Sequence, residues 1–492
     1  MDKVCLIIPP SIFLLDERVF PMLGILKVAA VLGKSGVEVL DLTGIKNFDQ
    51  VASIYAKMST DIKYFCLTAT TPHLPAVARI ISEIRAVRSD AKIVLGGPHV
   101  TLVNSAYKKA VKNSLNNSRI AKVLEQLKCM SDVVVAGDGE KTISLALQNN
   151  APKLIDADDV NSPLFLTDEG LEESPFPARN LIDLHSYHYT IEGVSATSLI
   201  AQLGCPFNCS FCGGRKSPSF RRIRNRSSEN VIKEIVFLCE KYGYCGFMFY
   251  DDELNVNVNI IPLMRLIAEK QKELGVKWRL RGFIKSELLT DEQAEAMYQA
   301  GFRWILVGFE SGSAKILEII NKKAIVEQNS RCFKIARDHG LKVKALMSIG
   351  HPGETEQSVL DTKNWLLQVR PDDFDVTVIT CYPGTSYYDQ AELRNGDGIW
   401  VYTHPGTGEK LYQADLDFSK APAYFKGVPD EYKSYVFTDG LTAERIVELR
   451  DNMEEEVRKK LQIPFNTSAP SMLYEHSMGQ TKFPPHILRT SG

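Results

Sequence analysis

The sequence has 492 residues, more than one hydrophobic core usually spans, so we expect two or three domains. Apolar residues make up 44% of it and charged residues 24%, which is ordinary for a globular protein. The formal net charge of −2 gives no overall basic field, and no apolar run approaches the roughly 18 residues of a membrane span. We therefore expect a cytoplasmic protein without nucleic-acid or membrane partners.

Residues 1–150 alternate short apolar strands with amphipathic helices. This alternation predicts an α/β domain with a doubly wound parallel sheet and with ligand sites at the carboxyl ends of its strands. The first strand runs into Pro9 and Pro10 and not into Gly-x-Gly-x-x-Gly, so the phosphate turn of a nicotinamide domain is absent. The expected strands are 3–10, 37–42, 64–71, 92–100 and 132–140, and the expected helices include 21–36 and 74–90.

A second strand–helix series follows a linker at 151–195 that is rich in Pro, Asp and Glu. Six strand–helix units in residues 196–395 predict a partial (βα)6 barrel, with its chemistry at the carboxyl-end mouth. Residues 396–492 lose this pattern, and we interpret them as a small mixed C-terminal region that caps the site or binds substrate. The expected barrel strands are 198–204, 246–252, 277–282, 304–312, 342–350 and 374–384.

Three cysteines, Cys205, Cys209 and Cys212, lie in "GCPFNCSFCGG" directly after the first barrel strand. Three thiolates can hold a [4Fe–4S] cluster and leave the fourth iron open. A zinc knuckle is the alternative, but no fourth Cys or His follows within the next dozen residues. The other seven cysteines are scattered, as expected of reduced thiols in a cytosolic protein.

The spacing CxxxCxxC resembles that of the radical S-adenosylmethionine (SAM) superfamily, in which the open iron chelates SAM and reductive cleavage yields a 5′-deoxyadenosyl radical. The later strand ends agree with this resemblance. It implies carboxylates of "YDDE" on the SAM ammonium, an arginine on its carboxylate, "FESGS" on its ribose, and Met347 and Tyr382 on its adenine. The residues implied for SAM are Phe211, Gly213, Asp251, Asp252, Glu253, Arg281, Glu310, Ser311 and Met347.

The N-terminal domain resembles the flavodoxin-like, Rossmann-type cobalamin (B12) domain that precedes the barrel in one radical SAM subclass. Its glycine turns "GGPHVT" and "GDGE" carry this resemblance, together with "PMLGILKVAAVL" and "LTATTPHLP". No Asp-x-His-x-x-Gly loop is present, so we expect cobalamin without a protein histidine on cobalt. The residues implied to line the corrin and its nucleotide tail are Leu23, Gly24, Thr68, Thr70, Gly97, His99, Gly139 and Glu140.

The resemblance implies an enzyme that works anaerobically and methylates an unactivated carbon of a small molecule or biosynthetic intermediate, by way of a 5′-deoxyadenosyl radical and methylcobalamin. An oxidative cyclase or a ring-rearranging enzyme is the alternative, and a non-catalytic corrinoid or iron–sulfur carrier is a further one. The expected electron donor is a flavodoxin or a ferredoxin. His476 and Tyr382 are candidate catalytic residues, and we expect the basic stretch 215–226 to be a solvated loop.

Overall fold

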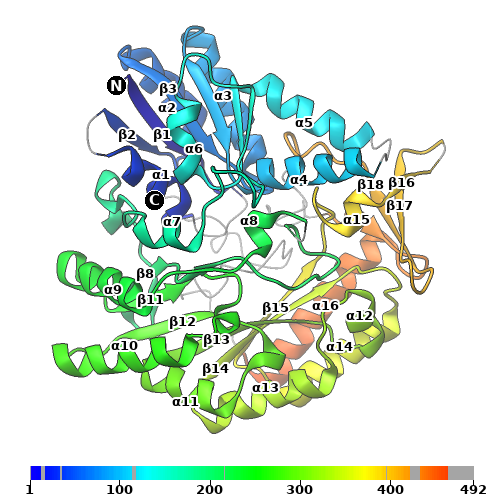
Figure 1. Cartoon of the computed structure of the whole chain (residues 1–492). Helices are drawn as coiled ribbons and strands as arrows, with labels where there is room; N and C mark the ends of the chain where they lie inside the picture. The colour runs from blue at the N-terminus through cyan, green and yellow to red at the C-terminus, as the bar shows by residue number, and fades with distance from the viewer. Residues whose placement is uncertain are drawn as a thin grey trace.

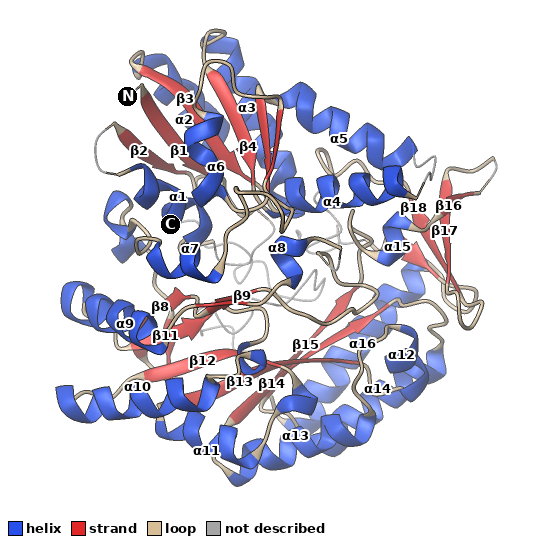
Figure 2. Cartoon of the chain, in the orientation of Figure 1, coloured by secondary structure: helices blue, strands red, loops and turns tan. Residues whose placement is uncertain are grey.

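The computed structural model has two α/β layers that face each other, with a small sheet at one side (Figures 1 and 2). The N-terminal sheet lies above the barrel strands in these views, and the C-terminal strands lie beside α15 (Ser386–Asp389). The structure describes residues 2–12, 17–33, 36–113, 118–214, 216–394, 396–421 and 433–463.

The first sheet is parallel throughout, with the strand order β2-β1-β3-β4-β5-β6. This order is that of a doubly wound fold, in which the order of the strands reverses between β1 and β3. A sixth strand, β6, adds to the sheet within the segment that we expected to be a linker. The strands are β1 (Lys3–Ile8), β2 (Val37–Asp41), β3 (Ile62–Thr68), β4 (Lys92–Gly96), β5 (Val133–Ala136) and β6 (Leu154–Asp156).

Helices cover both faces of this sheet, so its central strands are apolar on both sides. One face packs against α1 and α6 through residues such as Leu26 and Ala146. The other face packs against α2, α3, α4 and α5 and continues into the main core. The helices are α1 (Leu23–Leu32), α2 (Phe48–Met58), α3 (Leu74–Val87), α4 (Pro98–Lys112), α5 (Ser118–Met130) and α6 (Gly139–Ala146).

The second sheet contains six consecutive parallel strands, β8, β11, β12, β13, β14 and β15, with β7 (Thr190–Ile191) antiparallel at one edge. It is the partial barrel expected from the sequence. Its strands are β8 (Val194–Leu199), β11 (Gly246–Phe249), β12 (Arg279–Ile284), β13 (Phe302–Glu310), β14 (Lys342–Ile349) and β15 (Asp373–Val378).

Helices follow the barrel strands and pack on their outer side, where apolar positions such as Ile235 and Leu263 are buried. Polar caps begin several of them: the Ser227 and Thr355 hydroxyls accept hydrogen bonds from amides of the first turn. The helices are α9 (Ser228–Tyr242), α10 (Ile260–Leu274), α11 (Asp291–Gln299), α12 (Ala314–Ile319), α13 (Val326–Asp338) and α14 (Glu356–Val369).

The C-terminal region forms a four-stranded antiparallel sheet and one long helix. Helix α16 (Ala443–Leu461) packs against β15 and α14, where the buried Arg458 pairs with Asp373. The strands are β16 (Glu392–Leu393), β17 (Ile399–Thr403), β18 (Lys410–Ala414) and β19 (Val436–Phe437). The fold class expected from the sequence is thereby confirmed in all three parts.

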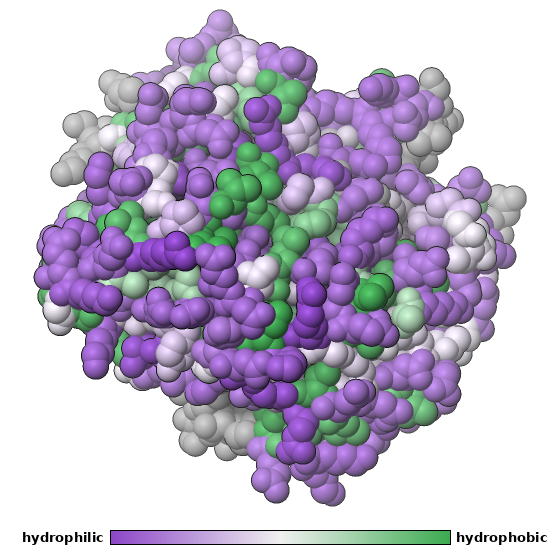
Figure 3. Space-filling model, turned by 60° about the horizontal axis from the view of Figure 1, so that its bottom comes forward, coloured by the Kyte–Doolittle hydropathy of each residue, from purple (hydrophilic) through white to green (hydrophobic). Residues whose placement is uncertain are grey.

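The view of Figure 3 shows a mainly hydrophilic surface, crossed by a narrow band of hydrophobic residues. Among the described residues, no helix combines the length and the apolar character that crossing a bilayer requires.

Candidate functional site

The three cysteines lie on a loop between β9 (Gln202–Leu203) and α8 (Pro218–Arg221), at the barrel mouth. Gly204 begins the loop with a φ of +89°, and a Cβ there would lie 2.2 Å from the carbonyl oxygen of Arg222. The Cys205 amide donates to the Phe220 carbonyl at 2.8 Å, and the Ser210 amide donates to the Ile320 carbonyl at 2.8 Å. The backbone of the loop is therefore held at its start and at its middle by neighbouring segments.

The thiols of this loop fit a cluster better than a single ion. In the described part of the chain, no three His, Cys, Asp or Glu side chains converge on one metal ion. In a four-iron cluster each thiolate binds a different iron, so the thiolates need not converge. Burial raises the pKa of Cys205 to about 11 and also raises the pKa of Cys209. The loop therefore offers protonated thiols, and iron would displace their protons on binding.

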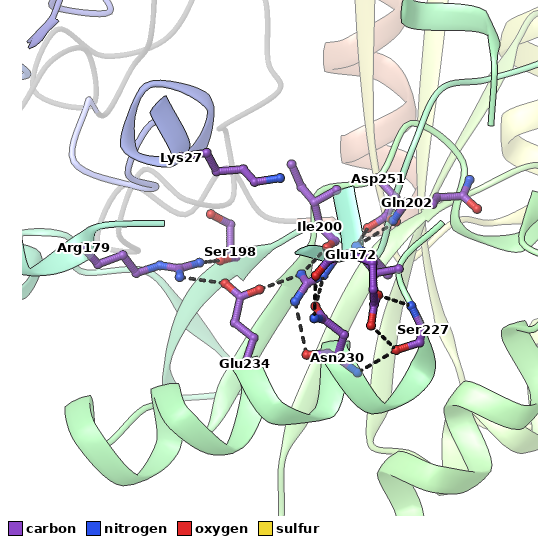
Figure 4. Close-up of polar contacts among 12 residues, drawn as sticks. Lys27, Glu172, Arg179, Ser198, Ile200, Gln202, Ser227, Asn230, Glu234 and Asp251 are labelled. Carbon is purple, nitrogen blue, oxygen red and sulfur yellow. Dashed lines mark hydrogen bonds and ion pairs between the residues drawn. The ribbon is translucent and has the colours of Figure 1, made fainter. Parts of the chain in front are cut away.

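Three carboxylates follow β11, and the structure gives them different surroundings. Asp251 is buried and accepts hydrogen bonds from the amides of Ala201 at 3.1 Å and Gln202 at 2.6 Å (Figure 4). Burial raises the pKa of Asp251 to about 7, although the two backbone amides oppose this shift. Asp251 therefore anchors the chain that enters the cysteine loop.

Glu253 differs from the two aspartates in its hydrogen bonding. Asp252 accepts from the Gly204 amide at 3.2 Å. No hydrogen bond reaches the Glu253 carboxylate from any described residue, and burial raises the pKa of Glu253 to about 7. A cationic amine would satisfy such a partly buried acid by a charge-assisted hydrogen bond.

Glu310 lies in a buried polar chain at the end of β13, where its backbone has a φ of +66°. Its carboxylate accepts from Lys322 Nζ at 3.1 Å and from Ser348 Oγ at 2.8 Å. Ser348 Oγ also lies 2.9 Å from His351 Nε2. The His351 ring packs edge-on against Phe211 of the cysteine loop, with the centroids 5.4 Å apart. The strand ends and the cysteine loop are thus one connected structure.

Several residues implied for SAM lie in other surroundings. Arg281 donates to the Tyr189 hydroxyl at 2.6 Å from the middle of β12. The Ser311 hydroxyl lies 3.0 Å from that of Thr362 and accepts from the Ser313 amide. Met347 is almost completely buried. Their roles toward SAM stay predictions.

Two further candidates of the barrel half, Gly213 and Tyr382, contact segments outside the barrel. A Cβ on Gly213 would lie 3.3 Å from Leu102 of α4, so the cysteine loop touches the N-terminal domain. The Tyr382 ring lies 5.9 Å from that of Phe418. His476 lies outside the described residues, and its role stays a prediction.

A cavity of about 1110 Å³, including its open mouth, lies at the carboxyl ends of β1, β3, β4 and β5. Its apolar wall includes Leu6, Val94 and Val135, and its floor includes Leu203 and Phe220 from the barrel half. Five of the residues implied for cobalamin line it: Gly24, Thr68, Gly97, Gly139 and Glu140.

The other three residues implied for cobalamin lie beside this cavity. Leu23 lines a smaller neighbouring cavity. Thr70 Oγ1 lies 2.6 Å from His73 Nδ1 in a short turn. His99 is buried with its Nδ1 2.9 Å from Thr71 Oγ1, and burial lowers the pKa of His99 to about 3. His99 is therefore neutral at neutral pH, and its role toward cobalamin stays a prediction.

Two charged residues that line the cavity, Lys27 and Asp138, were not predicted from the sequence. Lys27 lies 3.5 Å from Glu140, and Asp138 pairs with Arg224 at 2.5 Å. Asp138 stands inside the "GDGE" turn, so its place beside Gly139 was the available signal. Lys27 had no such signal.

The expectation that the basic stretch 215–226 is a solvated loop is wrong for Arg224 and Arg226, whereas Arg222 is exposed. Arg224 is buried and pairs with Asp138, and Arg226 pairs with Glu234 at 2.6 Å. Glu234 also accepts from Arg179 of the preceding segment at 2.7 Å, as Figure 4 shows. These arginines therefore join the barrel to the N-terminal domain and to residues 151–195.

Comparison with known proteins identifies the two halves of the chain. Residues 17–112 match the model of the B12 binding domain, and residues 199–366 match that of the radical SAM superfamily. The chain therefore belongs to the radical SAM enzymes that carry a B12-binding domain. The cofactors expected from the sequence, cobalamin, a [4Fe–4S] cluster and SAM, are confirmed at the level of these domains.

Individual relatives differ in activity. An uncharacterized methyltransferase of Pyrococcus horikoshii is 27% identical over 416 residues, which are 80% of this chain and 84% of the relative. The anaerobic magnesium-protoporphyrin IX monomethyl ester cyclase of Rubrivivax gelatinosus is 23% identical over 370 residues. That match covers 72% of this chain but only 62% of the cyclase.

Among solved structures, the radical SAM methyltransferase TsrM of Kitasatospora setae, with cobalamin and a [4Fe–4S] cluster bound, matches with a TM-score of 0.62. The match covers 82% of each chain at 18% sequence identity, so it concerns the fold.

Proposed function

We propose that this protein is a cobalamin-dependent radical SAM methyltransferase that methylates an unactivated carbon of a small molecule. When bound, the cluster and SAM would supply a 5′-deoxyadenosyl radical that removes a substrate hydrogen, and cobalamin would supply the methyl group. The chain itself would bind these groups side by side and exclude water from the space between them.

One observation carries the proposal. Phe220 forms part of the floor of the cavity at the N-terminal sheet, and its carbonyl accepts the hydrogen bond of the Cys205 amide. Phe220 therefore joins the two parts: it lines the cavity, and its carbonyl is hydrogen-bonded to the cysteine loop. Such proximity is what a reaction needs in which both cofactors act on one substrate.

Each residue set has a stated task in this proposal. Cys205, Cys209 and Cys212 would hold the cluster. Glu253, with Asp252 beside it, would accept from the SAM ammonium, and Glu310 would accept from its ribose. We propose that cobalamin is bound here without a protein histidine on cobalt.

The partners follow from this chemistry. The cluster must receive electrons one at a time from a low-potential donor, and we propose a flavodoxin or a ferredoxin. The match to a methyltransferase over 80% of the chain supports methylation of a small molecule or biosynthetic intermediate.

An oxidative cyclase is the second candidate, because a cyclase is among the relatives. Both reactions begin with cleavage of SAM to 5′-deoxyadenosine, and they differ in the fate of the SAM methyl group. Only the methyltransferase converts a second SAM to S-adenosylhomocysteine.

The test is an anaerobic incubation of the cobalamin-loaded protein with SAM, labelled in its methyl group, and a strong reductant. We expect 5′-deoxyadenosine, S-adenosylhomocysteine and labelled methyl on cobalamin, all measured by mass spectrometry. The Cys212→Ala variant is the control and should form no 5′-deoxyadenosine. Deoxyadenosine without any methyl transfer would contradict methylation and favour the cyclase.

A further inference from the structure

A tight turn after α12 is hydrogen-bonded to the cysteine loop. Its residues Asn321 and Lys323 both have left-handed backbones, with φ of +54° and +63°, although neither is glycine. Such conformations cost about 1 kcal/mol or more each and persist where the surroundings impose them. Two hydrogen bonds join the turn to the loop: the Ser210 amide donates to Ile320, and Asn321 Nδ2 donates to the Asn208 carbonyl at 2.8 Å.

This turn directs Lys322 inward. Lys322 is 5% exposed, whereas Lys323 beside it is exposed. The Lys322 ammonium lies 3.1 Å from Glu310, which also accepts from Ser348. An unpaired ammonium could not be buried in this way without a large loss of stability, so the carboxylate is part of the arrangement.

A second buried ammonium approaches the same loop. Lys285, 2% exposed, follows β12 and donates from Nζ to the Lys322 carbonyl at 3.0 Å. Its Nζ also lies 4.3 Å from the ring centroid of Phe207, between the first two cysteines. It pairs with Glu287 at 2.5 Å. Two lysines, one directly after β12 and one in the turn after α12, thus meet beside the cysteine loop.

Both charges are held close to the cysteine loop. The turn that carries Lys322 is hydrogen-bonded to Asn208 and Ser210, the residues on either side of Cys209. Lys285 contacts Phe207 of the same loop. Solvent screens little between buried groups, so these charges remain effective at physiological salt.

We propose that Lys322, with Lys285 beside it, is a positioning residue that favours the reduced state of the cluster. The proposal rests on the proposed function, since it needs a cluster on Cys205, Cys209 and Cys212. Reduction adds one electron from an external low-potential donor and no proton, so the cluster becomes more negative by one charge. A fixed positive charge stabilises that state more than the oxidised one.

The substitutions Lys322→Met and Glu310→Gln give opposite signs. Lys322→Met removes the positive charge and leaves Glu310 negative, which disfavours reduction. Glu310→Gln removes the negative partner and leaves Lys322 positive, which favours reduction. A merely structural role of the turn would not reverse sign between the two.

The experiment is an anaerobic redox titration of the reconstituted protein, followed by the electron paramagnetic resonance signal of the reduced cluster. For Lys322→Met we expect at least tenfold less reduced cluster, relative to oxidised, at a fixed potential, which corresponds to a midpoint lower by about 59 mV. Glu310→Gln should shift the midpoint upward, and Lys322→Arg should stay near the parent. Lys323→Met is the matched control: it removes the same charge one residue away, in solvent, and should leave the midpoint unchanged.

Iron per chain separates the possible failures. If the parent protein binds no cluster, the proposed function fails, and this inference with it. If Lys322→Met binds iron normally and keeps the parent midpoint, the inference alone is overturned. Should Lys322→Met fail to hold iron, Glu310→Gln and Lys285→Met decide, because an unchanged midpoint in both would equally overturn it.

Discussion

Gly204 is the position where a single methyl group should separate cluster binding from general stability. Its left-handed backbone disfavours any other residue by about 1–2 kcal/mol. A Cβ would also lie 2.2 Å from the Arg222 carbonyl oxygen, so that backbone has to move by roughly 1 Å to reach ordinary contact. The same region holds the Cys205–Phe220 and Gly204–Asp252 hydrogen bonds, each worth about 1 kcal/mol. For Gly204→Ala we expect a total cost of about 3 kcal/mol and a displaced cysteine loop.

Gly243 is the matched control for this substitution. It ends α9 with a φ of +74°, but a Cβ there meets nothing within 4 Å. Gly243→Ala should therefore lose about 1 kcal/mol from backbone strain alone and keep its cluster. The assay is iron per chain and cluster absorbance after anaerobic reconstitution, with thermal unfolding of both variants. Equal iron in Gly204→Ala and Gly243→Ala would refute the reasoning.

Three further substitutions test other parts of the site. Glu253→Gln should weaken SAM binding about tenfold in equilibrium dialysis and keep its iron. Asp251→Ala should lose iron and stability, because two buried amides lose their hydrogen-bond acceptor. If Asp251→Ala instead weakened SAM binding and kept its iron, Asp251 would be the SAM ligand. Gly24→Trp should lower the affinity for cobalamin at least tenfold in a spectroscopic titration, because Gly24 lines the cavity. The melting temperature should change little, since a Cβ at this position meets no other atom within 4 Å. An unchanged affinity would place cobalamin elsewhere. Burial lowers the pKa of His73 to about 3, so protonation below pH 6.5 stabilises only the unfolded chain. Relative to His73→Gln, the parent should therefore lose about 1.7 kcal/mol in total between pH 6.5 and 5. A urea-midpoint difference that does not change with pH would contradict this.

The alternation of strands and helices along residues 1–150 and 196–395 could be predicted, because the strands of the two large sheets are parallel, apart from the edge strand β7, and are largely buried. The barrel strands have apolar residues at successive or alternate positions and are bounded by glycine or polar turns, and the helices between them have clear periods. Strand β6 was missed because it has only three residues and lies among Pro and Asp. Its pairing with β5 is a backbone interaction that leaves no pattern in side chains.

The strand-end motifs could be placed at the mouth, but the role of each side chain could not be predicted. Nothing in "YDDE" tells that Asp251 turns back to the backbone while Glu253 stays open. The depth of Arg281 in the barrel depends on how far β12 extends beyond it, which the sequence does not fix.

Charged residues that act through long-range contacts were the hardest to recognise. Nothing in the sequence distinguishes Lys285 and Lys322 from surface lysines. Their burial depends on the ion pairs with Glu287 and Glu310, respectively, and on the cysteine loop beside them. Arg224 and Arg226 belong to a run that looks solvated, yet their carboxylate partners come from segments up to 86 residues away. Such pairs appear only when the three-dimensional arrangement is known.

The central claim is that one chain holds a cobalamin and an open iron–sulfur cluster next to each other. The most direct test is elemental analysis of the full-length protein after anaerobic reconstitution with iron, sulfide and cobalamin and removal of unbound cofactors. The account predicts about four iron and about one cobalt per chain, with the iron lost and the cobalt kept in Cys205→Ala. Iron without cobalt, or cobalt without iron, would contradict it.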